Sequence, residues 1–277
     1  MLVYNALLSK LTARKQGVVL MQQIGIYEQL ITQVIEQNLN RDQFYVGERQ
    51  LESAEAATWL SRFLGKLVEH AINAIPNSNE RLQEQISLAN SLVLWLKDHI
   101  RDDELINENL IDSQGRILTA LFNTQNPIAA NLKDYSSDIF PLTGLTQSEL
   151  FSGANTGISL ETELKREIKS SDTIYWLVSF IKWTGLRIFK NELEAFTKSG
   201  NKLKVITTSY MGATDARAVE FLANLPNTEV KLSYNNQQER LHAKSYLFMR
   251  NTGFHTGYIG SSNLSHSALT SGLEWNL

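Results

Sequence analysis

Two long apolar runs in the second half of the chain strongly restrict how that half can fold. They are TIYWLVSFI at residues 173–181 and KLKVITT at residues 202–208, and both are rich in β-branched or aromatic side chains. Such runs are typical of strands buried in a sheet. Between them, residues 186–200 have helical periodicity and end at Gly200, a usual helix stop. A strand, a helix and a second strand in this order predict an α/β layer.

The same alternation extends to the end of the chain. Helices are predicted at LETELKREIKSS (160–171) and DARAVEFLANL (215–225), and further strands at EVKLSY, HAKSYLFM and HTGYIGSS. The sheet is therefore predicted to be mostly parallel or mixed.

The first half has a different pattern, with apolar residues spaced as on one face of a helix. This spacing predicts helices over residues 24–39, 60–75 and 82–100, each with a buried face. We predict a helical domain over 21–142, used as a scaffold or for partner docking, then a linker over 143–158 and an α/β domain over 159–277. Residues 1–20 are predicted to be an N-terminal extension, with Met21 as the alternative start.

Composition excludes some classes of protein. The chain has no cysteine, so disulfides and cysteine-based zinc sites are excluded, and a cytoplasmic location is expected. No apolar run is long enough to cross a membrane. Residues 151–277 hold 14 basic and 11 acidic side chains, whereas the rest of the chain holds 12 and 18. This modest basic excess is compatible with phosphate contacts without requiring them.

Residues suited to phosphate chemistry gather in the last strands. His242 and Lys244 are two residues apart in a predicted strand, so they share a face. The turn Gly260-Ser261-Ser262-Asn263 and then Glu274 follow. Histidine can act as a nucleophile or a general acid and base. Lysine and asparagine can hold phosphate oxygens, and a carboxylate can orient the imidazole.

This arrangement resembles the phospholipase D superfamily, whose signature is H-x-K followed by G-S/G-x-N. The matching residues are His242, Lys244, Gly260, Ser261 and Asn263, and Glu274 corresponds to a glutamate of the nuclease branch. The resemblance implies an αβα sandwich with a mixed sheet. The chain departs from the pattern at Met249, where many members have aspartate, and this departure argues more against lipid-type activity than against nuclease activity.

A narrower resemblance links most of the chain to the N-terminal part of bacterial superfamily 2 helicases of the DEAD/DEAH type. It rests on segments such as GIYEQLITQ, LTALFNTQNPIAANL and VITTSYMGATD. The sequence holds no GxxxxGK[ST] motif and no DEAD/DEAH box. We therefore expect a fragment whose full-length relatives carry a helicase motor, with a role in restriction or defence.

The resemblance implies a two-step, metal-independent hydrolysis. His242 forms a phosphohistidine, Lys244 and Asn263 hold the nonbridging oxygens, and Glu274 orients His242. The mechanism needs two H-x-K motifs and the chain has one, so a homodimer with His242 of each copy at the interface is expected. No metal and no cofactor are expected.

Other polar residues are weaker candidates for substrate binding. Loop residues at the carboxyl ends of strands often bind ligands, although ordinary loop polarity explains them equally well. His255 is expected in a turn or at a strand edge, and His266 on the surface. The candidates are Ser261, Ser262, Lys182, Thr208, Ser209 and Arg240.

Three functions remain open from the sequence. The first is a nuclease module acting on nucleic acid, for which DNA is the favoured substrate. The second is a catalytically silent module that docks on DNA. The third is a phospholipid phosphodiesterase, against which we count the absence of basic amphipathic helices.

Overall fold

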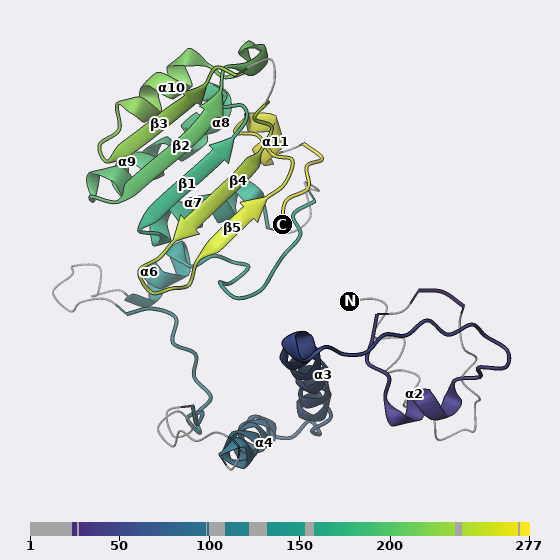
Figure 1. Ribbon diagram of the computed structural model, residues 1–277. Helices are drawn as coiled ribbons and strands as arrows, with labels where there is room; N and C mark the ends of the chain where they lie inside the picture. The colour runs from purple at the N-terminus through teal and green to yellow at the C-terminus, as the bar shows by residue number, and fades with distance from the viewer. Residues whose placement is uncertain are drawn as a thin grey trace. The chain divides into compact units, whose positions relative to one another are not determined.

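The computed structural model describes residues 24–26, 28–97, 99, 109–121, 132–152, 158–235, 240–270 and 272–277. The chain divides into two units, Met1–Ile117 and Leu118–Leu277, which are described separately below (Figure 1). The predicted extension over residues 1–20, the alternative start at Met21, and Asp98 and Ile100 at the end of the predicted helix 82–100 lie outside the described residues.

The N-terminal unit is helical, as predicted. It contains α2 (Gln33–Asn38), α3 (Ser53–Asn73) and α4 (Arg81–Leu96). The helix predicted over residues 24–39 is much shorter than expected. Thr32 is the cause, because its hydroxyl accepts a hydrogen bond from the Ile35 N–H at 3.3 Å and its backbone is extended, which starts α2 there.

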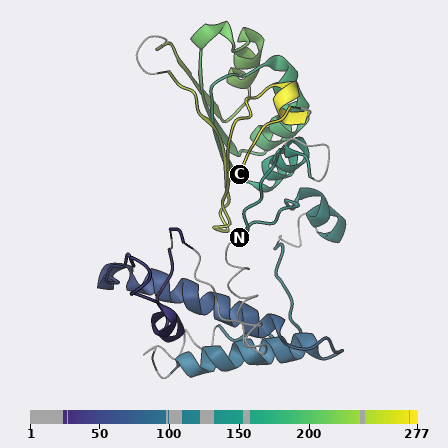
Figure 2. The ribbon, with the colours of Figure 1, turned by 90° about the vertical axis from the view of Figure 1, so that its right-hand side faces the viewer.

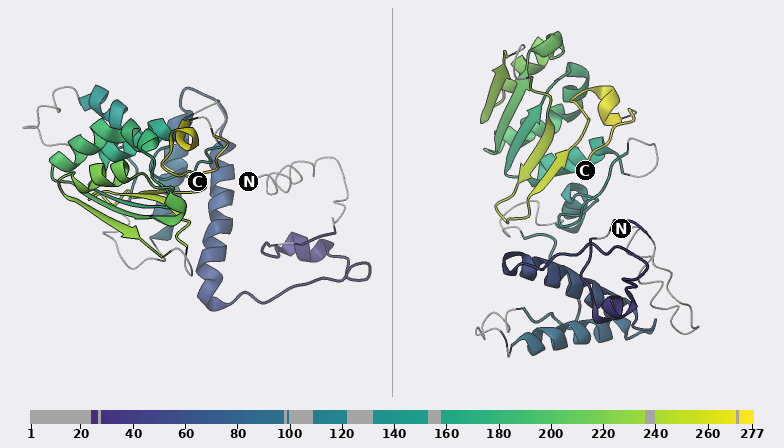
Figure 3. Two further views of the ribbon diagram at one scale, coloured as in Figure 1. Left: turned by 90° about the horizontal axis from the view of Figure 1, so that it is seen from above. Right: turned by 45° about the vertical axis from the view of Figure 1, so that its right-hand side comes forward.

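The apolar stripe of α3 is less buried than predicted. Among the described residues α3 buries no side chain fully, and Leu60, Leu64 and Leu67 are 46%, 57% and 45% exposed. In α4 only Ile86 is buried. α3 and α4 contact each other (Figure 3). A contact with one neighbouring helix covers only one side of a helix, so the rest of each apolar stripe stays exposed.

The C-terminal unit is built on a five-stranded mixed sheet in the order β3-β2-β1-β4-β5. β1 (Thr173–Val178), β2 (Lys202–Thr208) and β3 (Thr228–Ser233) are parallel. β4 (Lys244–Met249) is antiparallel to β1, and β5 (Thr256–Ile259) is antiparallel to β4. This confirms the predicted α/β class, and β2 spans the residues of KLKVITT.

The helices of this unit lie on one face of the sheet, as the edge-on view in Figure 2 shows. On the other face Tyr175, Ile206 and Leu247 remain 40%, 42% and 39% exposed. Of the two helical layers of an αβα sandwich, the described residues therefore supply one. The helical elements are α6 (Leu132–Ile139), α7 (Leu160–Ser170), α8 (Trp183–Leu186), η3 (Arg187–Phe189), α9 (Lys190–Lys198), η4 (Tyr210–Gly212), α10 (Ala216–Ala223) and α11 (His266–Thr270).

The hydrophobic core fills the space between the sheet and these helices. Its largest fully buried side chains are Trp176, Tyr246, Phe189 and Phe248. The ring of Trp176 meets those of Phe189 and Tyr246 edge-on, at centroid distances of 6.3 and 5.9 Å. Burying such a side chain stabilises the fold by roughly 1.5–3 kcal/mol, so this layer fixes the ends of β1 and β4, where the candidate site lies.

The boundary between the units differs from the predicted one. Residues 132–152 pack with the α/β unit instead of forming the end of a helical domain and a linker. The carboxylate of Glu163 on α7 accepts hydrogen bonds from the backbone N–H groups of Leu142 and Thr143 at 3.0 and 2.9 Å. Phe151 is buried and pairs with Asn276 through two backbone hydrogen bonds.

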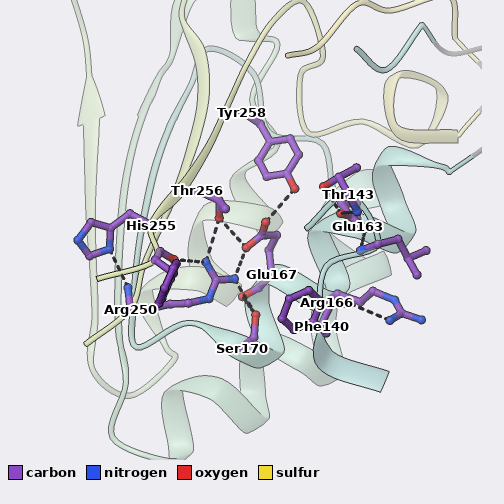
Figure 4. A network of polar contacts seen from close by, with 12 residues as sticks. Phe140, Thr143, Glu163, Arg166, Glu167, Ser170, Arg250, His255, Thr256 and Tyr258 are labelled. Atoms are coloured by element: carbon purple, nitrogen blue, oxygen red, sulfur yellow. Dashed lines mark hydrogen bonds and ion pairs between the residues drawn. The ribbon is translucent and has the colours of Figure 1, made fainter. Parts of the chain in front are cut away.

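A buried ion pair joins α7 to the β4–β5 hairpin (Figure 4). Glu167 is fully buried and pairs with Arg250. Its carboxylate also accepts from the hydroxyls of Thr256 and Tyr258 at 2.7 and 2.8 Å. Burial raises the pKa of Tyr258, and the neighbouring Glu167 charge raises it further. The network therefore fixes a helix to a hairpin across the end of the sheet.

Candidate active site

The candidate site lies where β1 ends and β4 begins. Val178 is the last residue of β1 and pairs with Lys244, the first residue of β4. The predicted strand began at His242, two residues earlier than β4 does. The pairing nevertheless continues, because the Ala243 carbonyl accepts from the backbone N–H and the hydroxyl of Ser179, both at 2.9 Å. His242 is thereby held beside the end of β1, with its ring 6.4 Å from that of Phe180.

His242 and Lys244 lie side by side, as their spacing predicted. The Lys244 Nζ atom is 3.2 Å from Nδ1 and 3.1 Å from Nε2 of His242. It also donates to the His242 carbonyl at 3.1 Å. An ammonium group can only donate, so a ring nitrogen that it bonds must accept with a free lone pair. The contact therefore places the cation beside both ring nitrogens, either of which can attack phosphorus when its lone pair is free.

Lys244 holds its charge in a largely buried place. The residue is 7% exposed and points to the helix-covered face of the sheet. This burial lowers its pKa, and the Glu274 carboxylate partly opposes the shift. A desolvated cation is strongly attracted to an anion that enters the site, because little water screens the pair.

Asn263 is oriented by the backbone of the β1 end. Its Oδ1 atom accepts from the Phe180 N–H at 3.1 Å. Because its partner is an N–H donor, the bonded atom must be the amide oxygen, and the NH₂ group is the other terminal group of the side chain. Within the described residues this NH₂ group donates no hydrogen bond, so it remains a donor that a phosphate oxygen can use.

The turn that carries Asn263 depends on close backbone approach. A Cβ atom on Gly260 would lie 2.1 Å from the Trp275 carbonyl oxygen. The segment around Trp275 lies along β5, where Ile259 and Leu277 exchange two backbone hydrogen bonds. Only glycine fits at this position, and the close contact places Glu274 at the same end of the sheet as Asn263.

The two serines of the turn hold this last segment. Ser261 accepts from the Trp275 N–H at 2.9 Å. Ser262 is fully buried, donates to the Ala268 carbonyl at 3.2 Å and accepts from Nδ2 of Asn276 at 2.8 Å. The structure does not support direct substrate contact by Ser262, because its hydroxyl is enclosed and already bonded.

Glu274 is half-buried, and its charge acts on Lys244 and Tyr246. Within the described residues it forms no hydrogen bond to His242. The expectation that Glu274 orients the nucleophile therefore stays a prediction, and in this structure its charge acts on the lysine.

The other candidates at the carboxyl edge are mostly engaged in local structure. Thr208 is fully buried and donates to the Ser233 carbonyl at 3.1 Å, and Ser209 donates to the same oxygen at 3.3 Å. Both therefore hold β2 to β3, and Thr208 is too enclosed to contact a ligand, whereas substrate contact by Ser209 stays a prediction. Arg240 is exposed and lies 5.1 Å from the ring centre of Tyr210. Substrate contact by Arg240 stays a prediction.

Lys182 forms the next contact along this edge, with Asp215. Asp215 was not among the residues predicted from the sequence. The Asp215 carboxylate accepts from the Trp183 N–H at 2.8 Å and pairs with Lys182 Nζ at 3.2 Å. The hydrogen bond from the Trp183 N–H lowers the pKa of Asp215 most, and the hydrogen bond and charge of Lys182 lower it further. The available signal was the position of Asp215 as the first residue of the predicted helix 215–225, where an acidic residue commonly caps.

The described residues contain neither a metal-binding cluster nor a membrane-spanning helix. They contain no group of three or more histidine, aspartate or glutamate side chains that could hold a metal ion. None of the helices described here is long and apolar enough to cross a membrane.

The C-terminal unit is an α/β domain with histidine, lysine and asparagine together at one end of a mixed sheet. A family model described as "Cardiolipin synthase, PLD-like domain" matches residues 164–277. The C-terminal half of the chain therefore contains a phospholipase-D-like phosphodiesterase domain, with the α/β class and the mixed sheet that the sequence predicted.

The other two comparisons are uninformative about function. One solved structure similar to this chain is the polyphosphate kinase of Porphyromonas gingivalis, at 14% identity and a TM-score of 0.34. The match covers 54% of this chain and 22% of that chain, and so low a score supports no argument. No curated protein matches.

Proposed function

We propose that this chain is a metal-independent nuclease module that cleaves nucleic acid, with DNA as the favoured substrate, through a phosphohistidine at His242. The observation that carries the proposal is the contact of Lys244 Nζ with His242 at 3.1–3.2 Å, at the end of the sheet where Asn263 offers its amide.

The first step breaks one ester bond. A ring nitrogen of His242 attacks phosphorus with its lone pair, the P–N bond forms, and the P–O bond to the leaving group breaks. The leaving oxygen takes a proton from a second histidine. Lys244 and the NH₂ group of Asn263 stabilise the nonbridging oxygens as their charge grows.

The second step releases the product. The second histidine, now neutral, takes a proton from water, and the water oxygen attacks phosphorus. The P–N bond breaks and its electron pair returns to His242. The positive charge of Lys244 serves both steps, because both pass through the same crowded, negatively charged phosphorus centre.

A second copy of the chain is the proposed source of the second histidine. The chain has a single H-x-K motif, and the His242 residue is exposed and so accessible to a partner. A two-fold axis beside His242 would bring two such residues to one phosphate, each able to serve as nucleophile or as acid.

The assignment of nucleic acid as the substrate rests on the resemblance to helicase-associated domains and on the basic excess of residues 151–277. A phospholipid phosphodiesterase is the second candidate, because the description of the matching family model names cardiolipin synthase. A silent docking module is the third.

A panel of substrates separates these functions. We expect the protein to cleave single-stranded or duplex DNA and to leave phospholipid vesicles intact, with cleavage lost in His242→Ala. Hydrolysis of vesicle lipid without cleavage of DNA would assign the second function. Binding of DNA that is equal in both proteins, without cleavage of any substrate, would assign the third.

A further inference from the structure

A basic hollow of about 670 Å³ lies between α8–η3 and the start of α11. The basic hollow is defined by the residues that line it. Its lining residues are Lys182, Thr184, Arg187, Ser265, His266 and Ser267. Three of these side chains are basic and three carry hydroxyls, so all six can donate a hydrogen bond and none is acidic.

The basic hollow is continuous with the candidate active site through the backbone. Phe180 donates to the Asn263 side chain, and two residues further on the Lys182 N–H donates to the Leu264 carbonyl at 2.8 Å. Ile181 and Leu264 also form a parallel bridge. The segments that carry Lys182 and Ser265 are therefore direct extensions of those that place Asn263.

A glycine makes this arrangement possible. A Cβ atom on Gly185 would lie 2.5 Å from the carbonyl carbon and oxygen of Leu264 and from the Ser265 nitrogen. The absence of a side chain lets α8 pack directly on the backbone after Asn263. Arg187, which follows α8, thereby lines the same hollow as Ser265, His266 and Ser267.

The charges of the basic hollow suit an anion. Arg187 is exposed and forms no ion pair within the described residues. Its guanidinium can donate two parallel hydrogen bonds to a phosphate. Lys182 is held by Asp215 at 3.2 Å, which positions its ammonium at the rim and leaves its other protons free to donate.

We propose that the basic hollow binds a backbone phosphate of the nucleic-acid strand next to the phosphate that is cleaved. This inference rests on the proposed function. A nucleic acid repeats its phosphates along the strand, so a second anion site beside the first fixes which bond reaches His242. In this proposal Arg187 binds the flanking phosphate directly, and Lys182, His266 and the hydroxyl groups of the hollow surround it.

Binding and cleavage both test the inference. The variant is Arg187→Gln combined with His266→Gln. The matched control is Lys202→Gln, which removes an exposed charge at the start of β2, the end of the strand away from the site. The binding probe is a short fluorescein-labelled single-stranded DNA titrated at several salt concentrations. We expect affinity to fall about tenfold and the slope of log affinity against log salt to shrink by about 0.7 for one lost phosphate contact, with the control like the wild type.

Cleavage supplies a second readout. Bis(p-nitrophenyl) phosphate is a diester without a flanking phosphate, so we expect the ratio of kcat/KM for the DNA to kcat/KM for this diester to fall about tenfold in the variant. An unchanged ratio together with an unchanged salt slope would overturn the inference. Weakened binding to cardiolipin vesicles with unaltered DNA binding would instead assign the hollow to a lipid and overturn the nucleic-acid assignment.

The outcomes for the hollow and for the proposed function are distinguishable. If the wild type cleaves neither substrate, the proposed nuclease activity fails, while the salt slope still decides whether the hollow binds a phosphate. If cleavage is present and the slope and the ratio are both unaltered, the hollow fails and the nuclease activity stands.

Discussion

At the scale of single residues, the protonation of Lys244 makes both stability and activity depend on pH. Burial lowers its pKa below the ordinary lysine value of 10.5, and the Glu274 carboxylate raises it in part. The unfolded chain then binds more protons than the folded one between the two pKa values, so stability rises with pH in that window. Activity that needs the charged lysine must fall in the same window.

Glu274→Gln removes the group that supports this charge. We expect the alkaline fall of kcat/KM to move to lower pH in the variant, because the pKa of Lys244 drops further when the carboxylate is lost. A pH profile of diester hydrolysis for both proteins measures the shift. A fall at unaltered or higher pH would show that Glu274 does not act through Lys244.

Gly260→Ala tests the close approach that places Asn263 and Glu274. The new Cβ atom would meet the Trp275 carbonyl oxygen at 2.1 Å and the Asn276 Cα at 2.7 Å, and both are backbone atoms. We expect a loss of about 1–3 kcal/mol in the free energy of unfolding, measured by urea denaturation.

The control for this variant is Gly65→Ala in α3, where a new Cβ has no neighbour within 4 Å. It should be neutral or stabilising, because alanine favours a helix more than glycine does. Equal stability of the Gly260 and Gly65 variants would show that the turn has room for a side chain.

The sequence predicted the residues at the site better than their contacts. The spacing of His242 and Lys244 was sufficient to predict their adjacency, since a strand repeats every two residues. The resemblance placed Glu274 at the site beside His242, but its action on Lys244 was not predicted, because it depends on the last segment folding back along β5. The burial of Ser262 and Thr208 follows from similar long-range pairing, which a local pattern does not contain.

At the scale of elements, the ion pair between α7 and the β4–β5 hairpin gives the sharpest prediction. Arg250→Met leaves the fully buried Glu167 carboxylate without its cation, which is expected to cost about 3–5 kcal/mol in the free energy of unfolding. Adding Glu167→Gln removes the charge and keeps an acceptor for Tyr258, so the double variant should recover part of the loss. Urea denaturation measures both.

The control is Lys165→Met, which breaks a partly exposed pair with Glu161 on the same helix. A surface pair of this kind contributes under about 1 kcal/mol. If Arg250→Met costs no more than this control, the buried network does not hold the hairpin to α7.

Elements with strong apolar patterns were predicted well, and elements set by single contacts were not. The buried strands at β1 and β2 begin where the sequence placed them. The helix predicted over residues 186–200 is instead divided into α8, η3 and α9, and α8 already begins at Trp183. The close packing of Gly185 on Leu264 places the turn of α8 next to the site. The local periodicity of the sequence contains no information about such a long-range contact.

At the scale of the whole molecule, the boundary between the units was predicted too late in the chain. Polar, glycine-containing composition made residues 143–158 resemble a linker, yet Glu163 binds the backbone at Leu142 and Thr143 and Phe151 is buried. A buried carboxylate that caps a remote loop is invisible to composition, so the C-terminal unit is larger than the sequence indicated.

The proposed dimer predicts how subunits behave when mixed. If each phosphate needs His242 from two copies, a dimer with one His242→Ala subunit is inactive. After subunit exchange with an equal amount of the variant, about a quarter of the dimers keep both histidines, so activity per total protein should fall to about a quarter. A fall only to half, or activity in a species that sediments as a monomer, would show that one chain suffices.

The central claim is that His242, assisted by Lys244, cleaves phosphodiesters without a metal ion. The most direct measurement is cleavage of plasmid and single-stranded DNA in excess EDTA by the wild type and by His242→Ala. The account predicts that wild-type cleavage persists in the chelator and that the variant has none. Cleavage that stops in EDTA and returns with Mg²⁺, or that survives in His242→Ala, would contradict it.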